Sequence, residues 1–587
     1  MTTEGFRDVL EIGRQDRPDL YDLEAEKPEP LVPRDRRFEI DERTTADGVE
    51  RPVDASEVRE LAATLRERNV EAVAVALLHA YADPENERVV AETLREELAV
   101  PVSASHEVLA EFREFERTST TAVDAYVRPA IDTYVGQLVD EAGDAGIPAP
   151  RIMQANGGIA DPETVCEHAV TTTLSGPAAG VVGAAATVDD DDDVEGLVTF
   201  DMGGTSSDVS LVRDGRAERT TDAEIDGLPI RTPMVDVNTV GAGGGSIAWI
   251  DSGGALRVGP ESSGSRPGPA CYGRGGTEPT VTDANVVLGY IGPETALGGE
   301  MTLDVEAARD ALGRLADEAG LEGPLEAAQG VYRVANATMT RTIRSVTVER
   351  GHDPREFALV AFGGAGPMHA AALADSLSVD RVVVPRPGGV LSAFGLLAAD
   401  ESYDAVRTVG VDLEGADSTT LEAVYDDLVA DVLADASDRD AARVKRAADC
   451  RYAGQSFELT VPVGETFDAA AVADRFHEAH ERTYGYAMDE SIEVVNLRTT
   501  ATIPGTEPGL SHEGSGAAVV GTREAHFPEA GAHETTVYDW ERLETGASVP
   551  GPAVLEQAES TTVVPPNWDG EILVDGTLVM TSGGESR

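Results

Sequence analysis

Lysine and cysteine are scarce in this sequence, and long apolar runs are absent. Only two lysines occur, Lys27 and Lys445, so arginine carries nearly all of the 46 positive charges. The three cysteines stand far apart without a CxxC pair, which argues against a disulfide framework and a structural zinc site. No run reaches the roughly 18 apolar residues of a membrane span, and no signal peptide opens the chain. We therefore expect a cytoplasmic protein without a membrane span.

Positive charge is also scarce relative to negative charge. The chain has 107 acidic residues and a formal net charge of −61. We do not expect nucleic acid as a partner, because a surface that binds phosphate backbones needs a basic field. Acidic residues occur in almost every segment, and we interpret the dense run Asp189–Asp193 as a solvated loop. A uniformly acidic, lysine-poor surface stays hydrated when salt screens its self-repulsion, which predicts a halophilic protein.

The length of the chain and the order of its strand-like and helix-like segments predict several domains of mixed α/β structure. A chain of 587 residues is too long for one core, and 41% hydrophobic residues indicate a globular protein. Strand-like and helix-like segments alternate up to about residue 400, which is typical of α/β domains with mixed or parallel sheets. The later part has a helix, two β-type stretches and a Gly/Pro-rich segment. We predict domains at 1–190 and 191–402 and an α+β C-terminal domain at 403–587.

Hydrophobic periodicity indicates where the main elements lie. Helices are expected at Ala55–Arg68, Glu85–Leu98, Glu111–Gly143, Ser175–Ala186, Leu303–Ala319 and Pro324–Arg350. Strands are expected at Val70–His79, Val100–Ser103, Arg151–Gln154, Phe357–Phe362 and Arg381–Val384.

The stretch LVTFDMGGTSSDVSLV (Leu197–Val212) predicts a β-hairpin whose turn approaches an anion. Glycines without a Cβ let backbone N–H groups reach phosphate oxygens, and hydroxyl side chains add donors. An ordinary glycine-rich turn is the structural alternative. The residues to which we assign phosphate binding are Gly203, Gly204, Thr205 and Ser206.

Two aspartates flank this turn, and we take both as candidate catalytic residues. Asp201 ends the first strand, where its carboxylate can hold Mg²⁺ or orient the in-line nucleophile. Asp208 begins the second strand. It either supports the metal or caps the hairpin, and the sequence favours neither role over the other.

A second glycine turn occurs in ALVAFGGAGPMHAAALA (Ala358–Ala374), between a strand and a helix. Small residues here permit close backbone approach to a flat nucleoside, although a plain strand–turn–helix explains the segment equally well on its own. Together with the hairpin it suggests two turns around one nucleotide. The predicted nucleoside contacts are Gly363, Gly364, Ala365 and Gly366. We expect His369 to be a residue of the first helical turn rather than a catalyst.

Two further segments contain candidate residues with strong structural alternatives. In MVDVNTVGAGGGSIAWID, the tentative substrate residues are Asp236, Asn238, Gly243 and Gly244, and packing at the strand ends explains them as well. Cys271 is expected to be a buried thiol, because no nearby histidine can activate it.

These motifs, taken in order, resemble the hydantoinase A / 5-oxoprolinase family of the N-methylhydantoinase A type. The resemblance extends over essentially the whole chain. It rests on DMGGTSSDVSLV and AFGGAGPMHA together with TTEGFRDVLEIGRQ, SHEVLAEFREFERTSTTAVDAYV, QANGG, LSGPAAGV, DVNTVGAGGGSIAWID, PGPACYGRGGTEPTVTDANVVLG, RYAGQSFELTVPV, HERTYGY and GPAVLEQAESTTVVPP. The family belongs to the actin, Hsp70 and sugar-kinase fold superfamily. The resemblance therefore implies an α/β fold with two ribonuclease-H-like lobes and an ATP cleft, of which DMGGTSSD is the second phosphate hairpin.

The resemblance also implies a function. The chain is expected to be the ATP-binding A subunit of a hydrolase that phosphorylates the ring carbonyl of a hydantoin, N-methylhydantoin or 5-oxoproline. ATP and Mg²⁺, the latter on Asp201, are the implied cofactors, and a hydantoinase B-type subunit is the implied partner in a hetero-oligomer. An ATP-dependent ketone carboxylase subunit and a non-catalytic nucleotide-binding subunit are the alternatives.

The chain departs from the family at its beginning. Family members ordinarily begin with a first phosphate hairpin of the type DxGGTFTD, whereas this sequence starts at the following segment and has no second DxGGT. The N-terminal lobe is therefore expected to be incomplete. A miscalled start is the interpretation we favour, with a separate polypeptide or a decayed remnant as the other two. Whether this chain acts alone stays open.

Overall fold

The computed structural model describes residues 1–15, 20–22, 24–25, 27–188, 194–293, 301–506 and 508–583. Within these ranges the chain forms two compact units, each assembled from segments far apart in the sequence. Unit 1 comprises residues 1–175, 219–234 and 400–505, and unit 2 comprises residues 176–218, 235–399 and 506–587. The acidic run Asp189–Asp193 lies outside the described residues, so its interpretation as a loop stays a prediction.

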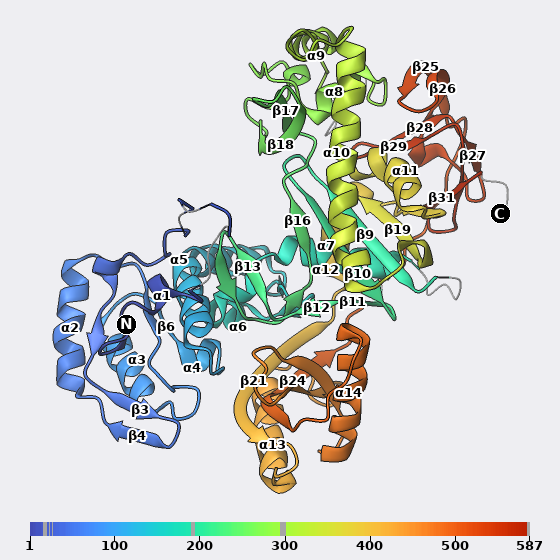
Figure 1. Cartoon of the computed structure of the whole chain (residues 1–587). Coiled ribbons are helices and arrows are strands. Elements are labelled where there is room, and N and C mark those ends of the chain that lie inside the picture. The colour runs from blue at the N-terminus through green and yellow to red at the C-terminus, as the bar shows by residue number, and fades with distance from the viewer. Residues whose placement is uncertain are drawn as a thin grey trace. The chain divides into compact units, whose positions relative to one another are not determined.

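Unit 2 is built on a mixed sheet to which nine strands of the described chain belong (Figure 1). Its path is β11 (Arg216–Ala217), β10 (Ser207–Arg213), β9 (Gly196–Met202), β19 (Phe357–Phe362), β20 (Arg381–Val384), β31 (Leu578–Ser582), β30 (Trp568–Ile572) and β27 (Ser548–Pro550), and β16 (Asn238–Val240) pairs with β10. β9 runs antiparallel to β10 and parallel to β19, which in turn runs parallel to β20. The carboxyl ends of β9 and β19 therefore meet at one edge of the sheet.

Helices and smaller sheets complete unit 2. The helices are α7 (Ser175–Thr187), α8 (Val281–Val287), α9 (Val305–Ala319), α10 (Pro324–Val346), α11 (Gly366–Leu377) and α12 (Leu391–Ala398). A hairpin of β17 (Ser246–Ile250) and β18 (Leu256–Ser262) and a sheet of β25 (Val519–Phe527), β26 (Gly531–Asp539), β28 (Ala553–Glu556) and β29 (Thr561–Val564) accompany them.

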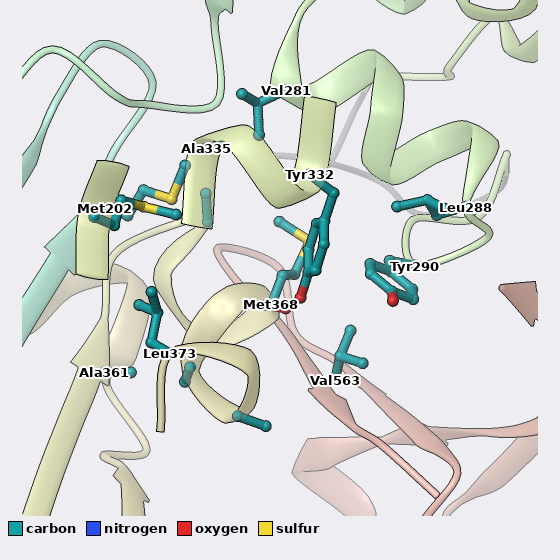
Figure 2. Packing of buried hydrophobic residues seen from close by; sticks show 14 of the residues in the cluster. Met202, Val281, Leu288, Tyr290, Tyr332, Ala335, Ala361, Met368, Leu373 and Val563 are labelled. Carbon is teal, nitrogen blue, oxygen red and sulfur yellow. Dashed lines mark hydrogen bonds between the residues drawn. The ribbon is translucent and has the colours of Figure 1, made fainter. Parts of the chain in front are cut away.

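One hydrophobic core joins the helices of unit 2 to its sheet (Figure 2). Tyr332 on α10 and Tyr290 meet edge to face with ring centroids 5.5 Å apart. The Tyr332 hydroxyl donates a 3.1 Å hydrogen bond to the carbonyl of Met368 at the start of α11. Met202, at the end of β9, is fully buried in the same core. The end of β9 and the start of α11 are thus fixed by packing on one side.

Unit 1 begins with a small α/β part. The short parallel strand pairs are β1 (Thr2–Thr3) with β2 (Glu39–Ile40) and β5 (Val73–Val75) with β6 (Val102–Ala104). Around them lie α2 (Ala55–Glu67), α3 (Glu85–Glu97) and the long helix α5 (Glu114–Ala145). The carboxylate of Asp54 caps α2 by accepting a 2.8 Å bond from the Ser56 N–H.

A six-stranded sheet makes up the rest of unit 1 in the described residues. Its order is β23 (Leu459–Val463), β22 (Arg443–Tyr452), β24 (Ile492–Ile503), β21 (Glu401–Asp412), β8 (Ile159–Ala160) and β7 (Ile152–Met153). The helices α13 (Ser418–Ala434) and α14 (Ala469–Tyr484) contribute to its hydrophobic core.

Most elements predicted from periodicity are confirmed, and β19 and β20 have the predicted bounds. The strand expected at Val70–His79 is shorter and ends at Val75. Its continuation leaves the sheet because side chains take its N–H groups: Leu77 donates to Glu87 Oε2 at 2.6 Å and Leu78 to Thr3 Oγ1 at 3.0 Å. None of the helices in the described ranges combines the length and apolarity that a membrane crossing requires.

The predicted domain boundaries do not coincide with the compact units. The α+β domain predicted at 403–587 contributes residues 403–505 to unit 1 and 506–587 to unit 2, and as a domain it stays a prediction. Strand pairing is the reason for this division. β21 joins β8 through Glu401 and Ile159, whereas β31 extends the sheet of unit 2 through Thr581 opposite Arg381.

Candidate functional site

The predicted hairpin is formed by β9 and β10, and its turn is open on the outside. Its residues Gly203–Ser206 are exposed or half-buried. A Cβ on Gly203 or Gly204 would meet no atom within 4 Å. In the described part of the chain, the N–H groups of Gly204 and Thr205 donate to no backbone acceptor. The turn therefore presents free donors next to unfilled space, which is the arrangement that an oxyanion needs.

Asp201 lies at the end of β9, where neighbouring strands bring further groups beside its carboxylate. Asp208 stands opposite it on β10, and Phe362 stands opposite it on β19. Burial raises the pKa of Asp201 to about 6, and the negative charge of Asp208 adds to the shift. No hydrogen bond from the described residues reaches the Asp201 carboxylate. A half-buried carboxylate without donors is a group that a bound cation stabilises.

Asp208 is partly held by the neighbouring strand. The hydroxyl of Thr239 on β16 donates a 2.6 Å hydrogen bond to Asp208 Oδ1. Burial raises the pKa of Asp208, and this hydrogen bond opposes the shift. The contact ties β16 to the hairpin, so Asp208 has a structural partner as well as a place beside Asp201.

The second predicted glycine turn packs directly against the end of β9. Ala365 N–H donates a 3.0 Å bond to the Met202 carbonyl. A Cβ on Gly363 would lie 2.3 Å from Asp201 Oδ1 and 2.5 Å from the Met202 oxygen. The φ of +80° at Gly363 is in the left-handed region that favours glycine. Only glycine lets the turn come this close to the Asp201 carboxylate.

The third glycine-rich segment, Gly241–Gly245, supports the hairpin turn. Gly244 N–H donates to the Gly203 carbonyl at 3.0 Å, and Gly245 N–H donates to the Gly204 carbonyl at 2.6 Å. We call Gly241–Gly245 the supporting loop. The C=O and N–H of one planar peptide point in opposite directions, so these two bonds turn the N–H groups of Gly204 and Thr205 away from the supporting loop.

Three hydroxyl side chains that the sequence analysis did not single out complete this arrangement. Ser207 Oγ donates a 2.6 Å bond to the Ala242 carbonyl, and Thr282 Oγ1 donates a 2.8 Å bond to the Gly244 carbonyl. Thr239, described above, is the third. Ser207 and Thr282 stand inside motifs that carry the family resemblance, but only their contacts, which bridge distant parts of the chain, identify them as supports.

Asp236 and Asn238 make their contacts away from the turn. Asp236 forms an ion pair with Arg350. Asn238 pairs with Val209 in the β10–β16 ladder, and its side-chain amide donates a 3.0 Å bond to Ser345 Oγ on α10. These contacts are typical of packing at strand ends, which the sequence analysis gave as the structural alternative for this segment. A role toward substrate stays a prediction for both residues.

His369 and Cys271 are fully buried, as expected of structural residues. His369 Nδ1 lies 2.7 Å from Asn336 Oδ1, and its ring stacks on Tyr332 at a centroid distance of 4.8 Å. Burial lowers the pKa of His369 to about 3, so the ring is neutral at ordinary pH. Burial also raises the pKa of the Cys271 thiol, which removes the thiolate that a nucleophile requires.

A His369→Gln variant is expected to lose stability without a change in the pH profile of catalysis. The folded-state pKa lies below the unfolded value of about 6.5, so the stability linked to His369 is complete above that pH and is lost as the pH falls toward 3. The variant lacks this titration, so its unfolding free energy is expected to fall less than that of the wild type between pH 7 and pH 5. Urea unfolding at both pH values checks this, and an altered pH–rate profile would contradict a purely structural role.

No group of three or more metal-ligating side chains occurs in the residues that the structure describes. The candidate is instead the carboxylate pair of Asp201 and Asp208 beside the open turn. Mg²⁺ is commonly held by one or two carboxylates, with water and phosphate oxygens as its other ligands. The donor-free carboxylate of Asp201 fits this pattern.

Comparisons with known proteins identify the family of the chain. Three models of one family match the chain in order: the hydantoinase/oxoprolinase N-terminal region at residues 1–98, hydantoinase/oxoprolinase at 117–405, and the hydantoinase/oxoprolinase C-terminal domain at 411–579. Both the hairpin turn and the second glycine turn lie within the 117–405 match.

Individual relatives are similar over nearly the whole chain. Caprolactamase subunit alpha of Pseudomonas jessenii is 34% identical over 99% of this chain and 87% of its own, and 5-oxoprolinase 1 of Arabidopsis thaliana is 34% identical over 98% and 49%. The crystal structure of the ATP-dependent caprolactamase from P. jessenii gives a TM-score of 0.86 at 33% identity, covering 99% of this chain and 88% of that one. Nucleotide-free acetone carboxylase gives 0.78 at 27% identity, covering 99% and 87%. The chain belongs to the hydantoinase/oxoprolinase family.

Proposed function

We propose that this chain is the ATP-binding subunit of an ATP-dependent enzyme that hydrolyses a cyclic amide. The observation that carries the proposal is the convergence of two glycine turns on the donor-free carboxylate of Asp201. One turn offers free N–H groups, and the other approaches so closely that no side chain fits. Two relatives, an ATP-dependent caprolactamase and a 5-oxoprolinase, support the nucleotide and the ring amide as substrates.

The same proposal assigns unit 2 as one ribonuclease-H-like lobe of an actin- or sugar-kinase-like ATPase fold. The order β10–β9–β19–β20 supports this assignment, with one antiparallel pair followed by parallel strands. In open sheets of this kind ligands bind at the carboxyl ends of the parallel strands, which is where Asp201 and the second glycine turn lie.

Each part of the site then has one task. The turn Gly203–Ser206 would donate hydrogen bonds to phosphate oxygens, and the turn Gly363–Gly366 would contact the nucleoside. Asp201 would hold Mg²⁺, and Asp208 stands opposite it as a second carboxylate. When bound, Mg²⁺-ATP supplies the phosphoryl group that makes the amide oxygen a leaving group, since an unstrained amide is otherwise a poor electrophile.

The proposal divides the reaction between two polypeptides. This chain activates the ring carbonyl, and a hydantoinase B-type subunit completes the hydrolysis of the activated ring. The caprolactamase relative is itself named as a subunit, which supports a hetero-oligomer. A cytoplasmic location belongs to the proposal because ATP is present there and all three cysteines are free thiols.

Lactam-dependent ATP turnover tests the proposal. ADP release is measured in high salt with the purified chain, alone and with its co-purified partner, in the presence of 5-oxoproline, N-methylhydantoin or caprolactam. One of these rings is expected to raise the rate about tenfold or more, because chemistry that needs the second substrate is slow without it. Absence of stimulation by every ring, with the partner present, would contradict the assignment.

A second candidate is a subunit of an ATP-dependent ketone carboxylase. The structural match to acetone carboxylase favours it. Acetone and bicarbonate are therefore included in the same assay, and ATP use that depends on both would select this reaction. A chain that binds ATP but shows no turnover with any ring or ketone, with its partner present, would instead be a non-catalytic nucleotide-binding subunit.

A further inference from the structure

The second glycine turn is supported from its other side by the turn that joins β28 to β29. In that turn, Gln557–Ser560, the Gln557 N–H donates a 3.0 Å hydrogen bond to the Ser560 carbonyl. Ser560 Oγ in turn donates a 3.1 Å hydrogen bond to the Gly363 carbonyl. Both turns belong to unit 2, in which β29 packs against α11 (Figure 1). The two turns therefore have fixed positions relative to each other.

Glu559, in the turn Gln557–Ser560, lies against glycines of two other segments. A Cβ on Gly389 would lie 2.2 Å from the Glu559 Cβ and 2.9 Å from its carbonyl oxygen, and a Cβ on Gly364 would lie 3.5 Å from the same oxygen. Gly388 accepts a 2.9 Å hydrogen bond from the Gly363 N–H, so these two glycine segments also bind each other. A side chain at position 389 would overlap with Glu559. The backbone and Cβ of Glu559 are thus held where three segments meet.

The carboxylate of Glu559 has no partner, although its backbone is held so closely. The residue is exposed, and within the described ranges its carboxylate takes part in no hydrogen bond or ion pair. The N–H of Gly364, which touches Glu559, donates to no acceptor among the same residues. The second glycine turn therefore carries an unused donor next to a residue with an unused, charged acceptor.

This combination suits a hydroxyl group and disfavours an anion. A carboxylate repels phosphate oxygens, but it accepts hydrogen bonds from hydroxyl groups, and such charge-assisted bonds are stronger than neutral ones. A hydroxyl group both donates and accepts, so neighbouring hydroxyls can donate to Glu559 and accept from the Gly364 N–H. The ribose of a nucleotide carries two neighbouring hydroxyls. An acidic side chain on a ribose hydroxyl is also how dinucleotide-binding folds recognise the nucleoside.

We propose that Glu559 binds the 2′ and 3′ hydroxyls of the nucleotide's ribose and makes the site selective for ribonucleotides. The inference rests on the proposed function, because it takes the second glycine turn as the nucleoside contact. Neighbouring residues of that turn approach the two carboxylates: a Cβ on Gly363 would lie 2.3 Å from Asp201 Oδ1, and Gly364 touches Glu559. The phosphates then lie on the Asp201 side of the turn and the ribose on the Glu559 side.

Nucleotide binding by the purified full chain in high salt with Mg²⁺ tests this proposal. Isothermal titration compares ATP with 2′-deoxy-ATP and 3′-deoxy-ATP. The wild type is expected to bind at least one of the two analogues about tenfold more weakly than ATP, because one charge-assisted hydrogen bond is lost. Equal binding of all three nucleotides overturns the proposal. Absence of ATP binding by the wild type contradicts the proposed function itself and this inference with it, so the two failures are distinguishable.

A carboxylate-removing variant identifies the residue that makes the distinction. Glu559→Ala is expected to bind ATP about tenfold more weakly and the discriminated analogue as the wild type does, so that the preference for ATP disappears. Glu318→Ala is the matched control, because Glu318 is an exposed residue of α9 in the same unit. Urea unfolding verifies that both variants are folded. A preference that persists in the Glu559 variant, or that is lost equally in the Glu318 variant, overturns the proposal.

Discussion

Asp201→Asn is expected to abolish ATP turnover and at the same time to stabilise the folded chain at neutral pH. The carboxylate lies at the meeting point of the two glycine turns, so its loss removes the proposed Mg²⁺ ligand. Removing a group that stabilises developing charge in a phosphoryl-transfer site lowers kcat by about 10³-fold. Asparagine has nearly the same shape, so the turns keep their places and the variant separates charge from packing.

The stabilisation follows from the pKa of Asp201. Its folded-state pKa of about 6 lies above the model value of 3.8, so the folded state holds the proton more tightly than the unfolded state. The stabilising contribution is therefore complete below about pH 4 and is lost as the pH rises through 6. At 1.36 kcal/mol per unit, the charged carboxylate costs about 3 kcal/mol at pH 7, and the neutral amide does not.

Urea unfolding at pH 4.5 and pH 7.5, in constant salt with EDTA and without nucleotide, measures this effect. The Asp201→Asn variant is expected to exceed the wild type in unfolding free energy, and by more at pH 7.5 than at pH 4.5. Asp214→Asn is the matched control, because Asp214 is exposed in the turn that follows β10. Full ATP turnover in the Asp201 variant would remove the proposed site. If the variant and the wild type instead show the same pH dependence of stability, burial does not raise the pKa of Asp201.

The hairpin and the second glycine turn were predictable because their signals are local. Short apolar runs on either side of DMGGTSSD predict two strands, and the glycines predict the turn between them. The strand Phe357–Phe362 is a continuous apolar run that a glycine ends, which is typical of a strand buried on both faces. The structure adds the register, in which Asp201 stands opposite Phe362 and hence beside Gly363.

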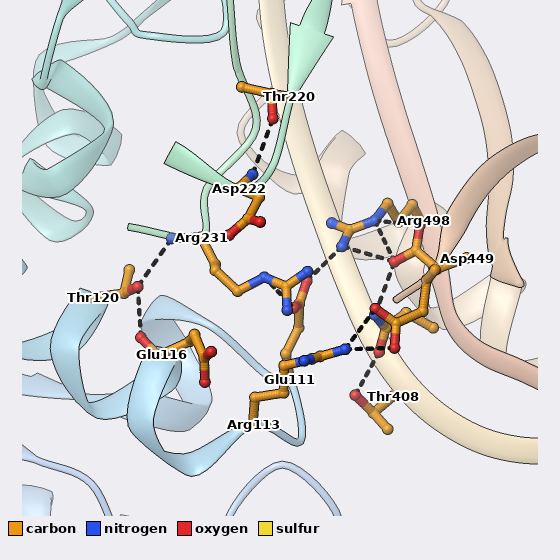
Figure 3. Close-up of polar contacts among 12 residues, drawn as sticks. Glu111, Arg113, Glu116, Thr120, Thr220, Asp222, Arg231, Thr408, Asp449 and Arg498 are labelled. Carbon is orange, nitrogen blue, oxygen red and sulfur yellow. Dashed lines mark hydrogen bonds and ion pairs between the residues drawn. The ribbon is translucent and has the colours of Figure 1, made fainter. Parts of the chain in front are cut away.

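The supporting loop and the two compact units were not predictable, because both depend on pairings between distant segments. Gly244 supports Gly203 through a backbone hydrogen bond, and backbone groups carry no sequence signature. Likewise, Arg498 meets Glu111 across most of the chain (Figure 3), and either residue alone resembles an ordinary surface charge. Asp236 shows the opposite case, in which a local signal pointed to the site and the contacts do not. It stands in a glycine-rich motif, but its side chain forms an ion pair with Arg350 rather than a contact with the hairpin turn.

Gly363→Ala is expected to impair the site more than any other glycine replacement in the two turns. The added Cβ would lie 2.3 Å from Asp201 Oδ1, and the φ of +80° strains any side chain. The left-handed conformation alone costs about 1–2 kcal/mol, and the clash must displace either the turn or the carboxylate. We expect a loss of unfolding free energy of about 2–4 kcal/mol together with loss of most ATP turnover.

Gly364→Ala is the matched control within the same turn. Its Cβ would meet only the Glu559 carbonyl oxygen, at 3.5 Å, which is an ordinary contact. Stability is therefore expected to stay within about 0.5 kcal/mol of the wild type. Equal destabilisation by the two variants would show that the close approach of Gly363 to Asp201 is not what requires glycine.

Alanine replacements at Gly203 in the hairpin turn and at Gly243 in the supporting loop test two different reasons for a glycine. One is the space that the fold needs, and the other is the space that a bound phosphate needs. A Cβ on Gly203 meets no protein atom, whereas a Cβ on Gly243 of the supporting loop would lie 2.5 Å from the carbonyl carbon of Thr205. Gly203→Ala is thus expected to leave unfolding unchanged and to weaken ATP binding about tenfold, because its methyl group enters the volume assigned to phosphate oxygens. Gly243→Ala is expected to lower stability and ATP binding together. Isothermal titration with ATP and urea unfolding measure both quantities, and unchanged ATP affinity in the Gly203 variant would place the phosphates elsewhere.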